Sequence, residues 1–314
     1  MNKKILAFIY NKKQKEFLIL KTKGDKLEIH GKSHWFTTTG SVENKESYEE
    51  AVKREVLEET GLEVKEIYNL KWGCRYKWQN KIHEELYFMA FIDLEKVKLD
   101  NIEVIDYQWR SLDSFVNLID WEGNKRELKS ILKLGAEQKI DHPWTRIDDY
   151  TSNECKTIFI NNEEASYLTW YNNKDFSKLK NVKQIYGICF DNLDKICIIN
   201  VTGNWTLPGG TPEKGESFEQ TLMREVDEEA DIEIKNIKPI GYNKIEQIKN
   251  RVKSTFYQLR YIANIVKIKP QTIDPAHNKI PKRKFISPEE FLEYCPWGKT
   301  GEKMINEAVR LKNI

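Results

Sequence analysis

The sequence predicts an α+β protein built from two domains in tandem, and three observations lead to this prediction. The chain has 314 residues, which is long for one compact core and sufficient for two domains. Both halves show the same order of strand-like, loop and helix-like segments. The most polar stretch, residues 135–154, contains no long apolar run. We therefore place the boundary near residue 140, which gives domains 1–140 and 141–314.

Each half is expected to begin with paired strands, because β-branched and aromatic residues are enriched between short polar turns. A loop, a helix, further strands and a helical tail should follow. In the first half these segments are residues 4–10, 16–22, 34–47, 48–60, 83–93 and 114–134. In the second half they are residues 184–190, 196–201, 204–217, 218–230, 254–266, 287–294 and 301–312.

The first helix of each half carries clear start signals. Ser47 precedes Glu50 by three residues, and Ser217 precedes Gln220 in the same way, which is the spacing of a capping box. At 100° per residue, one face of each helix is apolar and should point to the core. The residues of this face are Tyr48, Ala51, Val52 and Val56 in the first half, and Phe218, Thr221, Leu222 and Val226 in the second.

Acidic residues also fall on or beside this apolar face. They belong to two similar heptads, REVLEET from Arg54 and REVDEEA from Arg224. Carboxylates near a helix C-terminus oppose the macrodipole by roughly 0.3–1 kcal/mol each, and an i,i+4 acidic pair costs about 0.2–0.5 kcal/mol more. A divalent cation would reverse this penalty, and hard carboxylate oxygens suit Mg²⁺ or Mn²⁺. By contrast, Leu57 and Asp227 are expected to be exposed.

The composition argues against several other classes of protein. With 51 basic and 49 acidic residues, the net charge of +2 gives no argument for nucleic-acid or membrane binding. The five cysteines form no CxxC pair or zinc-like cluster, and their odd number argues against a disulfide framework. No apolar run reaches the length of a signal peptide or membrane span, so a cytoplasmic location is expected.

The two heptads lie inside longer stretches that resemble the Nudix box. This pattern reads Gly, five residues, Glu, seven residues, Arg-Glu, an apolar residue, any residue, Glu-Glu, any residue, Gly and an apolar residue. Residues 40–62 match every defined position, and residues 210–232 match all but Asp231, where the pattern has Gly. The resemblance implies two Nudix-type α/β/α sandwich domains. It also implies hydrolysis of a pyrophosphate bond in a nucleoside diphosphate linked to another moiety.

The resemblance also assigns roles to individual residues. The metal would be held, and the chemistry performed, by Glu55, Glu58 and Glu59 near Gly40, and by Glu225, Glu228 and Glu229 near Gly210. The structural pairs would be Glu46 with Arg54 and Glu216 with Arg224. At the end of the second helix, Asp231 should tolerate the left-handed conformation at some cost in stability.

The first half is most similar to dihydroneopterin triphosphate and deoxynucleoside triphosphate pyrophosphohydrolases, with diadenosine polyphosphate hydrolases next. In that subgroup the acid corresponding to Glu103 assists as a base or metal ligand, although an exposed loop acid is the alternative. Trp35, Tyr107 and Trp109 could stack a base or pterin, or could simply belong to the core. The second half has no acid that matches Glu103, so its proton acceptor must come from the box or an unassigned loop.

We therefore expect a Mg²⁺-dependent hydrolase, with Mn²⁺ as an alternative, that acts on a small nucleotide substrate and not on nucleic acid or membranes. Two alternatives stay open. Either the protein senses a nucleotide without turnover, or only the first half is catalytic while the second binds nucleotide or mediates dimerisation. A homodimer is compatible with either expectation.

Overall fold

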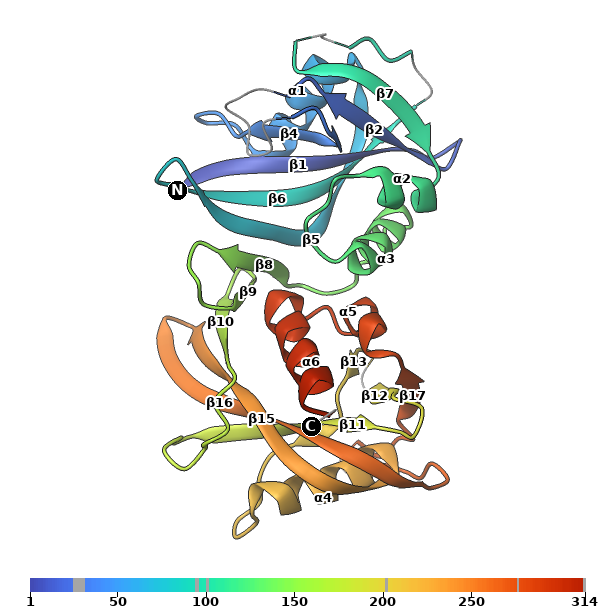
Figure 1. Ribbon diagram of the computed structural model, residues 1–314. Coiled ribbons are helices and arrows are strands. Elements are labelled where there is room, and N and C mark those ends of the chain that lie inside the picture. The colour runs from blue at the N-terminus through green and yellow to red at the C-terminus, as the bar shows by residue number, and fades with distance from the viewer. Residues whose placement is uncertain (25–31, 94–95, 100–101, 201–202, 276, 313–314) are drawn as a thin grey trace. The chain divides into compact units, whose positions relative to one another are not determined.

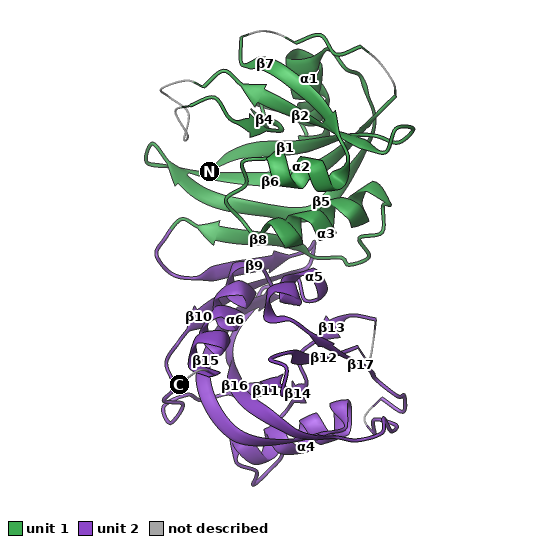
Figure 2. Ribbon diagram, turned by 45° about the vertical axis from the view of Figure 1, so that its right-hand side comes forward, with its two compact units in different colours: residues 1–151 green, residues 152–314 purple. Residues whose placement is uncertain are grey.

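The computed structural model describes all residues except 25–31, 94–95, 100–101, 201–202, 276 and 313–314. The chain divides into two compact units, Met1–Thr151 and Ser152–Ile314 (Figure 2). The division falls after the predicted position near residue 140, because strand β8 (Thr145–Tyr150) pairs in parallel with β5 (Val64–Trp78) of the first unit. The polar stretch in which we placed the boundary thus contributes a strand to the first sheet.

The first unit contains eight strands and three helices in the part of the chain that the structure describes. Its elements are β1 (Asn2–Asn11), β2 (Glu16–Thr22), β3 (Trp35–Phe36), β4 (Thr38–Ser41), α1 (Tyr48–Thr60), β5 (Val64–Trp78), β6 (Lys81–Ile92), β7 (Val104–Arg110), α2 (Leu112–Leu118), α3 (Lys125–Ala136) and β8. Strand β1 lies parallel to β6 and antiparallel to β2 and β4. Strand β2 also pairs with β3 and β7, and β5 pairs with β6.

The layers of the first unit follow from the alternation of side chains along β1. Ile5, Ala7 and Ile9 pack with Ala51, Val52 and Val56 of α1 in one core cluster. Leu6 and Phe8 point to the other side, where they pack with side chains of α2 and α3. The unit is therefore the expected α/β/α sandwich, with α1 on one side of the sheet and α2 and α3 on the other (Figure 1).

The second unit repeats this plan with an extra strand pair at its start. Its elements are β9 (Lys156–Ile160), β10 (Glu164–Tyr171), β11 (Val182–Phe190), β12 (Ile196–Asn200), β13 (Trp205–Thr206), β14 (Gly209–Gly210), α4 (Phe218–Ala230), β15 (Ile232–Lys249), β16 (Val252–Ile268), β17 (Lys282–Ile286), the 3₁₀ turn η1 (Pro288–Glu290), α5 (Phe291–Tyr294) and α6 (Gly298–Lys312).

The pairing of the second unit matches that of the first. Strand β11 lies parallel to β16 and antiparallel to β12 and β14, and β12 pairs with β13 and β17. One core cluster contains the side chains of α4, and the other contains those of α5 and α6. At the sheet edge, β10 pairs with β15 in antiparallel orientation, whereas β8 pairs in parallel with the corresponding β5.

The box glycine occupies the same place in both sheets. Gly40 in β4 pairs with Ile5 of β1, and Gly210 in β14 pairs with Ile185 of β11. These pairings align β1 with β11 and β6 with β16 residue by residue. They also bring each glycine against the helix that carries the acidic heptad.

Candidate functional site

The helices α1 and α4 begin and end as the sequence predicts. Ser47 and Ser217 accept hydrogen bonds from the backbone N–H of the residues three positions later, and both capping boxes are complete. Gly61 ends α1 in the left-handed conformation, and Asp231 ends α4 with φ of 48°. The side chain of Leu57 is exposed, and so is that of Asp227. These features fix which helix face carries the acids.

Each box glycine provides room for one carboxylate. A Cβ atom placed on Gly40 would lie 1.9 Å from the carboxyl carbon of Glu55, and one on Gly210 would lie 2.4 Å from that of Glu225. These separations are far below van der Waals contact, so the first acid of each heptad packs directly against the glycine backbone. The sequence pattern therefore has a steric reason in both units.

An arginine joins the loop and the acids in the first unit. The Arg54 guanidinium donates to Glu46 through Nε at 2.9 Å and Nη2 at 3.0 Å, which is a bidentate pair. Its Nη2 also donates to the Ser41 carbonyl at 2.8 Å. Its Nη1 lies 2.8 Å from Glu55 Oε1 and 3.3 Å from Glu58 Oε2. Arg54 thus holds the loop on the helix and bridges two of the three box acids.

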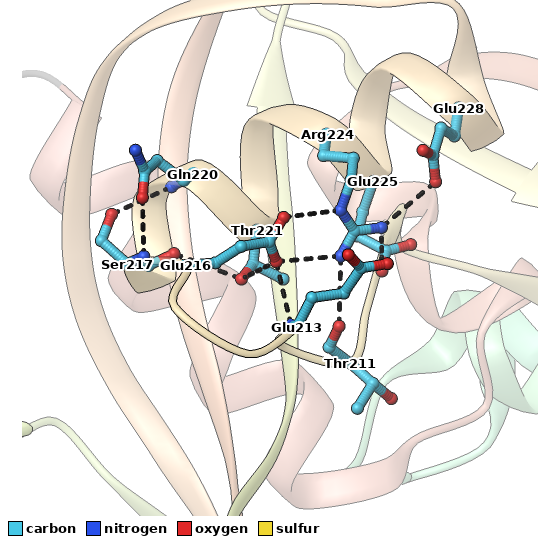
Figure 3. Close-up of polar contacts among 9 residues, drawn as sticks. All are labelled: Thr211, Glu213, Glu216, Ser217, Gln220, Thr221, Arg224, Glu225 and Glu228. Carbon is cyan, nitrogen blue, oxygen red and sulfur yellow. Dashed lines mark hydrogen bonds and ion pairs between the residues drawn. The ribbon is translucent and has the colours of Figure 1, made fainter.

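The second unit repeats the same network (Figure 3). Arg224 donates to Glu216 at 2.8 and 3.1 Å, to Glu225 at 2.9 Å, and to Glu228 at 3.2 Å. It also donates to the Thr211 carbonyl at 3.2 Å. The expected structural pairs, Glu46 with Arg54 and Glu216 with Arg224, are therefore both formed.

The acids of each box differ in burial, and burial shifts the pKa of three of them. Burial raises the pKa of Glu55 and of Glu225, although the adjacent arginine partly opposes this effect. Burial raises the pKa of Glu229 to about 7, despite a 2.8 Å hydrogen bond from the Gly209 N–H to its carboxylate. Glu59 is 8% exposed. The side chains of Glu58 and Glu228 are 59% and 39% exposed, so these two acids lie at the solvent side.

The donor chemistry of these acids fits a hard divalent cation, because all of them are carboxylates. The guanidinium between Glu55 and Glu58, and its counterpart in the second unit, already places a positive charge between two of these acids. The three acids of a box do not converge as a preformed cage, since no group of three or more His, Cys, Asp or Glu side chains among the described residues could hold a metal ion.

Glu103 lies near the first box and is exposed. It directly precedes β7, its carbonyl accepts a hydrogen bond from the Lys23 N–H, and its negative charge contributes to raising the pKa of Glu55.

The three aromatic residues proposed for stacking do not form one surface. Tyr107 and Trp109 of β7 pack against the core cluster that contains α1, whereas Trp35 packs against the cluster on the opposite side of the sheet. All three side chains are partly buried. The sheet register explains this separation, because β2 and β7 set Tyr107 and Trp109 on the α1 face while Trp35 lies opposite Lys21 on the other face.

In the second unit the structure brings two further side chains towards Glu229. Asp274 is 1% exposed, and its Oδ2 lies 2.8 Å from Nδ1 of His277. The charge of Asp274 raises the pKa of Glu229, and His277 lowers it. This pair lies in the segment between β16 and β17, whereas the sequence left the proton acceptor of the second half to the box or to an unassigned loop. Its one sequence signal is the close spacing of an acid and a histidine.

Asp231 connects this loop to α4. Its carboxylate accepts hydrogen bonds from the Thr272 N–H at 2.8 Å and the Thr272 hydroxyl at 2.7 Å. The residue that departs from the box pattern thus holds the segment that leads to Asp274. This side-chain role was not predicted from the sequence.

No helix in the described part of the chain is long and apolar enough to cross a membrane. Among curated proteins, a segment of 77 residues is 36% identical to the NAD-capped RNA hydrolase NudC of Haemophilus influenzae strain PittGG, covering 24% of this chain and 28% of that protein. A segment of 115 residues is 28% identical to Nudix hydrolase 6 of Arabidopsis thaliana, covering 35% of this chain and 39% of that protein. The chain therefore spans well under half the length of these relatives.

Solved structures similar to this chain include the dihydroneopterin triphosphate pyrophosphohydrolase of E. coli. It is 19% identical with a TM-score of 0.33, covering 43% of this chain and 95% of that one. The NUDIX domain family model matches this chain twice, over residues 2–131 and 185–306. Those two segments contain both acidic helices and the sheets that position them, so the chain belongs to the Nudix family and carries two Nudix domains in tandem.

Proposed function

We propose that both units hydrolyse a pyrophosphate bond in a nucleoside diphosphate linked to another moiety, with Mg²⁺ or Mn²⁺ held by the box acids. The observation that carries this proposal is the repeated network of Arg54 and Arg224. In both units the arginine holds the loop on the helix through a partly buried ion pair with a glutamate. The same arginine bridges two box acids beside the box glycine. The same network in both units supports the proposal that both are catalytic, because it places two carboxylates beside the box glycine in each unit.

The roles within each box follow from position. Glu55 and Glu225, the acids packed against the box glycines, would be metal ligands together with the more exposed Glu58 and Glu228 and with Glu59 and Glu229. A divalent cation bound there neutralises the pyrophosphate and lowers the pKa of water. Glu46 and Glu216 would position Arg54 and Arg224 without touching the substrate.

Each unit would supply its own proton acceptor for the attacking water. In the first unit the candidate is Glu103, whose exposed carboxylate affects the pKa of Glu55. In the second unit the candidates are Glu229, whose pKa of about 7 suits a base at neutral pH, and the Asp274–His277 pair beside it. The two units would thus take their proton acceptors from different parts of the fold.

For the first unit we propose dihydroneopterin triphosphate or deoxynucleoside triphosphates as substrates, with diadenosine polyphosphates next. For the second unit we propose only the general class, a nucleoside diphosphate linked to another moiety. Because curated relatives are named as NAD-capped RNA hydrolases, a capped RNA end belongs among the substrates to be tested, although the overall charge of +2 gave no argument for nucleic acid.

The test is formation of the hydrolysis products with Mg²⁺, separated by chromatography and identified by mass spectrometry, across a panel of dihydroneopterin triphosphate, deoxynucleoside triphosphates, diadenosine tetraphosphate, NADH and NAD-capped RNA. The triphosphates should release pyrophosphate or phosphate, whereas the other substrates should each yield two nucleoside phosphates or a nucleotide and a 5′-phosphorylated RNA. The Glu59→Gln and Glu229→Gln variants should each lose a different part of the activity by about 10²–10⁴-fold. The matched controls are Glu49→Gln and Asp227→Asn, which change exposed residues of the same helices. If the wild type binds these nucleotides and cleaves none, the protein is a sensor. If Glu229→Gln changes nothing, the second unit does not catalyse on this panel.

A further inference from the structure

The second unit contains a buried positive charge that no acidic residue neutralises. Arg260 of β16 is 2% exposed, and it forms no ion pair among the described residues. Its guanidinium donates to three uncharged acceptors, namely the Met304 sulfur at 3.2 Å, the Leu259 carbonyl at 3.1 Å and the Gln258 side chain at 3.1 Å. Burial lowers the pKa of Arg260 to about 10, so the group stays charged at neutral pH. Burying an unpaired charge is costly and calls for an explanation.

The first unit shows how this fold treats a buried arginine that has a structural role. Arg146 is 4% exposed and lies over the Trp72 ring, with 4.9 Å between the guanidinium carbon and the ring centroid. Its Nη1 lies 2.6 Å from Glu127 and its Nη2 lies 3.2 Å from Asp148. Two carboxylates thus neutralise Arg146, whereas Arg260 has the aromatic neighbours without the carboxylates.

The fold itself does not require a charge at position 260. Ile5 and Ile185 both pair with a box glycine, and the next residues, Leu6 and Tyr186, pair with Tyr87 and Arg260. Tyr87 is therefore the counterpart of Arg260, and in the first unit it lies buried against the rings of Trp72 and Trp121. An uncharged aromatic residue fills the same place, so the arginine serves something other than the sheet.

The side chains around Arg260 hold its guanidinium in a position suited to binding a ligand. Its guanidinium lies over the rings of Tyr186 and Trp297, with the guanidinium carbon 4.5 and 5.5 Å from the ring centroids. These two rings are only partly buried, as are Gln184 and Gln258 beside them, so solvent reaches the rim around the charge. A planar cation held between aromatic faces presents its remaining N–H groups in a fixed direction.

Two further polar atoms on the same side of the sheet have no hydrogen-bond partner within the described part of the chain. They are Nε1 of Trp170 and Oδ1 of Asn243, and both side chains are buried. Trp170 pairs with Asn243, and Asn243 pairs with Gln258, whose side chain accepts a hydrogen bond from Arg260, so these atoms form a row next to Arg260. Buried polar atoms normally find partners, which makes this row suitable for a polar ligand.

The row also connects to the box acids. Tyr186 pairs with Gly209, whose N–H donates to Glu229, and the charges of Glu229 and Glu225 both raise the pKa of Tyr186 after the larger effect of burial. The Arg260 charge acts on the same tyrosine with the opposite sign. One molecule with its pyrophosphate at the acids could therefore extend past Tyr186 to Arg260.

We propose that Arg260 binds an anionic group, a phosphate monoester or a carboxylate, on the part of the substrate that lies beyond the cleaved pyrophosphate in the second unit. The proposal rests on the proposed function for the identity of the bound molecule, but the anion subsite itself can be tested by binding alone. Arg260 is then a specificity-determining residue, and the second unit selects substrates that carry an additional negative charge.

The test compares three pairs of nucleotides that differ only in this group. NADP⁺ with NAD⁺ and coenzyme A with dephospho-coenzyme A test an added phosphate, and UDP-glucuronate with UDP-glucose tests a carboxylate. Dissociation constants are measured by calorimetry with the full chain in the presence of a chelator, so that no hydrolysis occurs. We expect the wild type to bind the more anionic member of at least one pair at least tenfold more tightly. The phosphate and carboxylate pairs identify which source applies.

The variants are Arg260→Met, Arg260→Lys and the control Lys253→Gln, which removes one exposed charge from the same strand. Arg260→Met should remove the discrimination, Arg260→Lys should retain part of it, and the control should leave it intact. If Arg260→Met fails to fold, Arg260→Lys still tests the proposal, because lysine keeps the positive charge and lacks the planar guanidinium group. Equal binding within all three pairs overturns the proposal, as does discrimination that survives in Arg260→Met. A failure of hydrolysis with intact discrimination would reject the proposed function and leave the subsite.

Discussion

Glu229 shows how a single side chain connects the chemistry of the site to the stability of the fold. Its pKa is raised from 4.5 to about 7, with burial as the largest cause and the charges of Glu225 and Asp274 adding to it. The folded protein therefore keeps a proton that the unfolded chain releases between these pH values. The free energy of unfolding of the metal-free protein should then fall as the pH rises from about 4.5 to about 7.

We predict that Glu229→Gln stabilises the metal-free protein at pH 8 by an amount on the order of 2 kcal/mol and has little effect at pH 4. The amide keeps an oxygen that can accept the Gly209 N–H and removes the charge that burial disfavours. The measurement is urea unfolding with a chelator at both pH values. The control Glu228→Gln changes a more exposed acid and should have a much smaller effect at either pH. Equal stability of wild type and Glu229→Gln at pH 8 would contradict the raised pKa.

The box glycines allow a second prediction at this scale. Gly210→Ala places a methyl group 2.4 Å from the Glu225 carboxyl carbon, and Gly40→Ala places one 1.9 Å from that of Glu55. The acid must move, and a displacement of about 1 Å in a catalytic group can cost about 10²-fold in rate. Each variant should lose the activity of its own unit. The activity of the other unit, measured in the same sample, is the control, and an unchanged rate in both would refute the packing argument.

At the scale of elements, the end of α4 explains why one defined box position can change without loss of the helix. Asp231 adopts the left-handed conformation expected of the missing glycine, and its carboxylate also binds Thr272. The sequence predicted the conformation and a cost in stability. The two hydrogen bonds offset part of that cost, because bonds to a charged group contribute about 1.5–3 kcal/mol.

We therefore predict that Asp231→Gly does not stabilise the protein, although glycine is the residue of the family pattern. Relief of the left-handed strain gains about 1–2 kcal/mol, and loss of the Thr272 bonds costs a similar or larger amount. Hydrogen exchange at residues 269–275 should increase while exchange in α4 changes little. Thr272→Val serves as the matched variant, since it removes the hydroxyl bond and leaves Asp231 in place. A gain in stability near 1–2 kcal/mol in Asp231→Gly would mean that the Thr272 bonds contribute nothing.

The same scale shows which elements the sequence could predict. The capping boxes, the apolar stripes and both arginine–glutamate pairs depend on residues close together in the chain, and all of these are confirmed. Strand β8 was missed because it lies in the most polar stretch of the chain, where no long apolar run indicates a strand. Arg146 and Asp148 are in fact buried, and Glu127 from α3 completes their ion pairs. Charges that neutralise each other across the fold cannot be recognised from local polarity.

The residues of the site could also be predicted only in part. The acids that surround each box glycine could be read from spacing, but the loop residues could not. Asp274 and His277 affect the pKa of Glu229 only because of the way the segment after β16 folds. Arg260 stands out only in the structure, where its hydrogen-bond acceptors are uncharged. Trp35 was grouped with Tyr107 and Trp109 because all are aromatic, and sheet register separates them.

At the scale of the whole molecule, each unit has two hydrophobic clusters of its own, one on each side of its sheet. Leu128 and Ile198 are fully buried in clusters of the first and second unit respectively. A large-to-small substitution at such a position typically costs about 2–5 kcal/mol. Because the clusters are separate, the damage should stay within one unit.

We predict that Leu128→Ala increases amide hydrogen exchange within residues 1–151 and lowers the activity of the first unit, while Ile198→Ala does the same for residues 152–314. Exchange measured peptide by peptide with mass spectrometry reports both units in one experiment. Each variant is the control for the other. A rise in exchange across both units in either variant would show that they unfold as one cooperative body.

The tie between Asp231 and Thr272 has a consequence for how related sequences should vary. Where a domain keeps glycine at the end of this helix, nothing constrains the residue that corresponds to Thr272. Where aspartate replaces the glycine, a serine or threonine should recur at that distant position, since the carboxylate would otherwise be buried without its donors. The two positions should therefore covary during evolution, and the pairing would mark a lineage of Nudix domains that changed a helix end into an anchor for a loop.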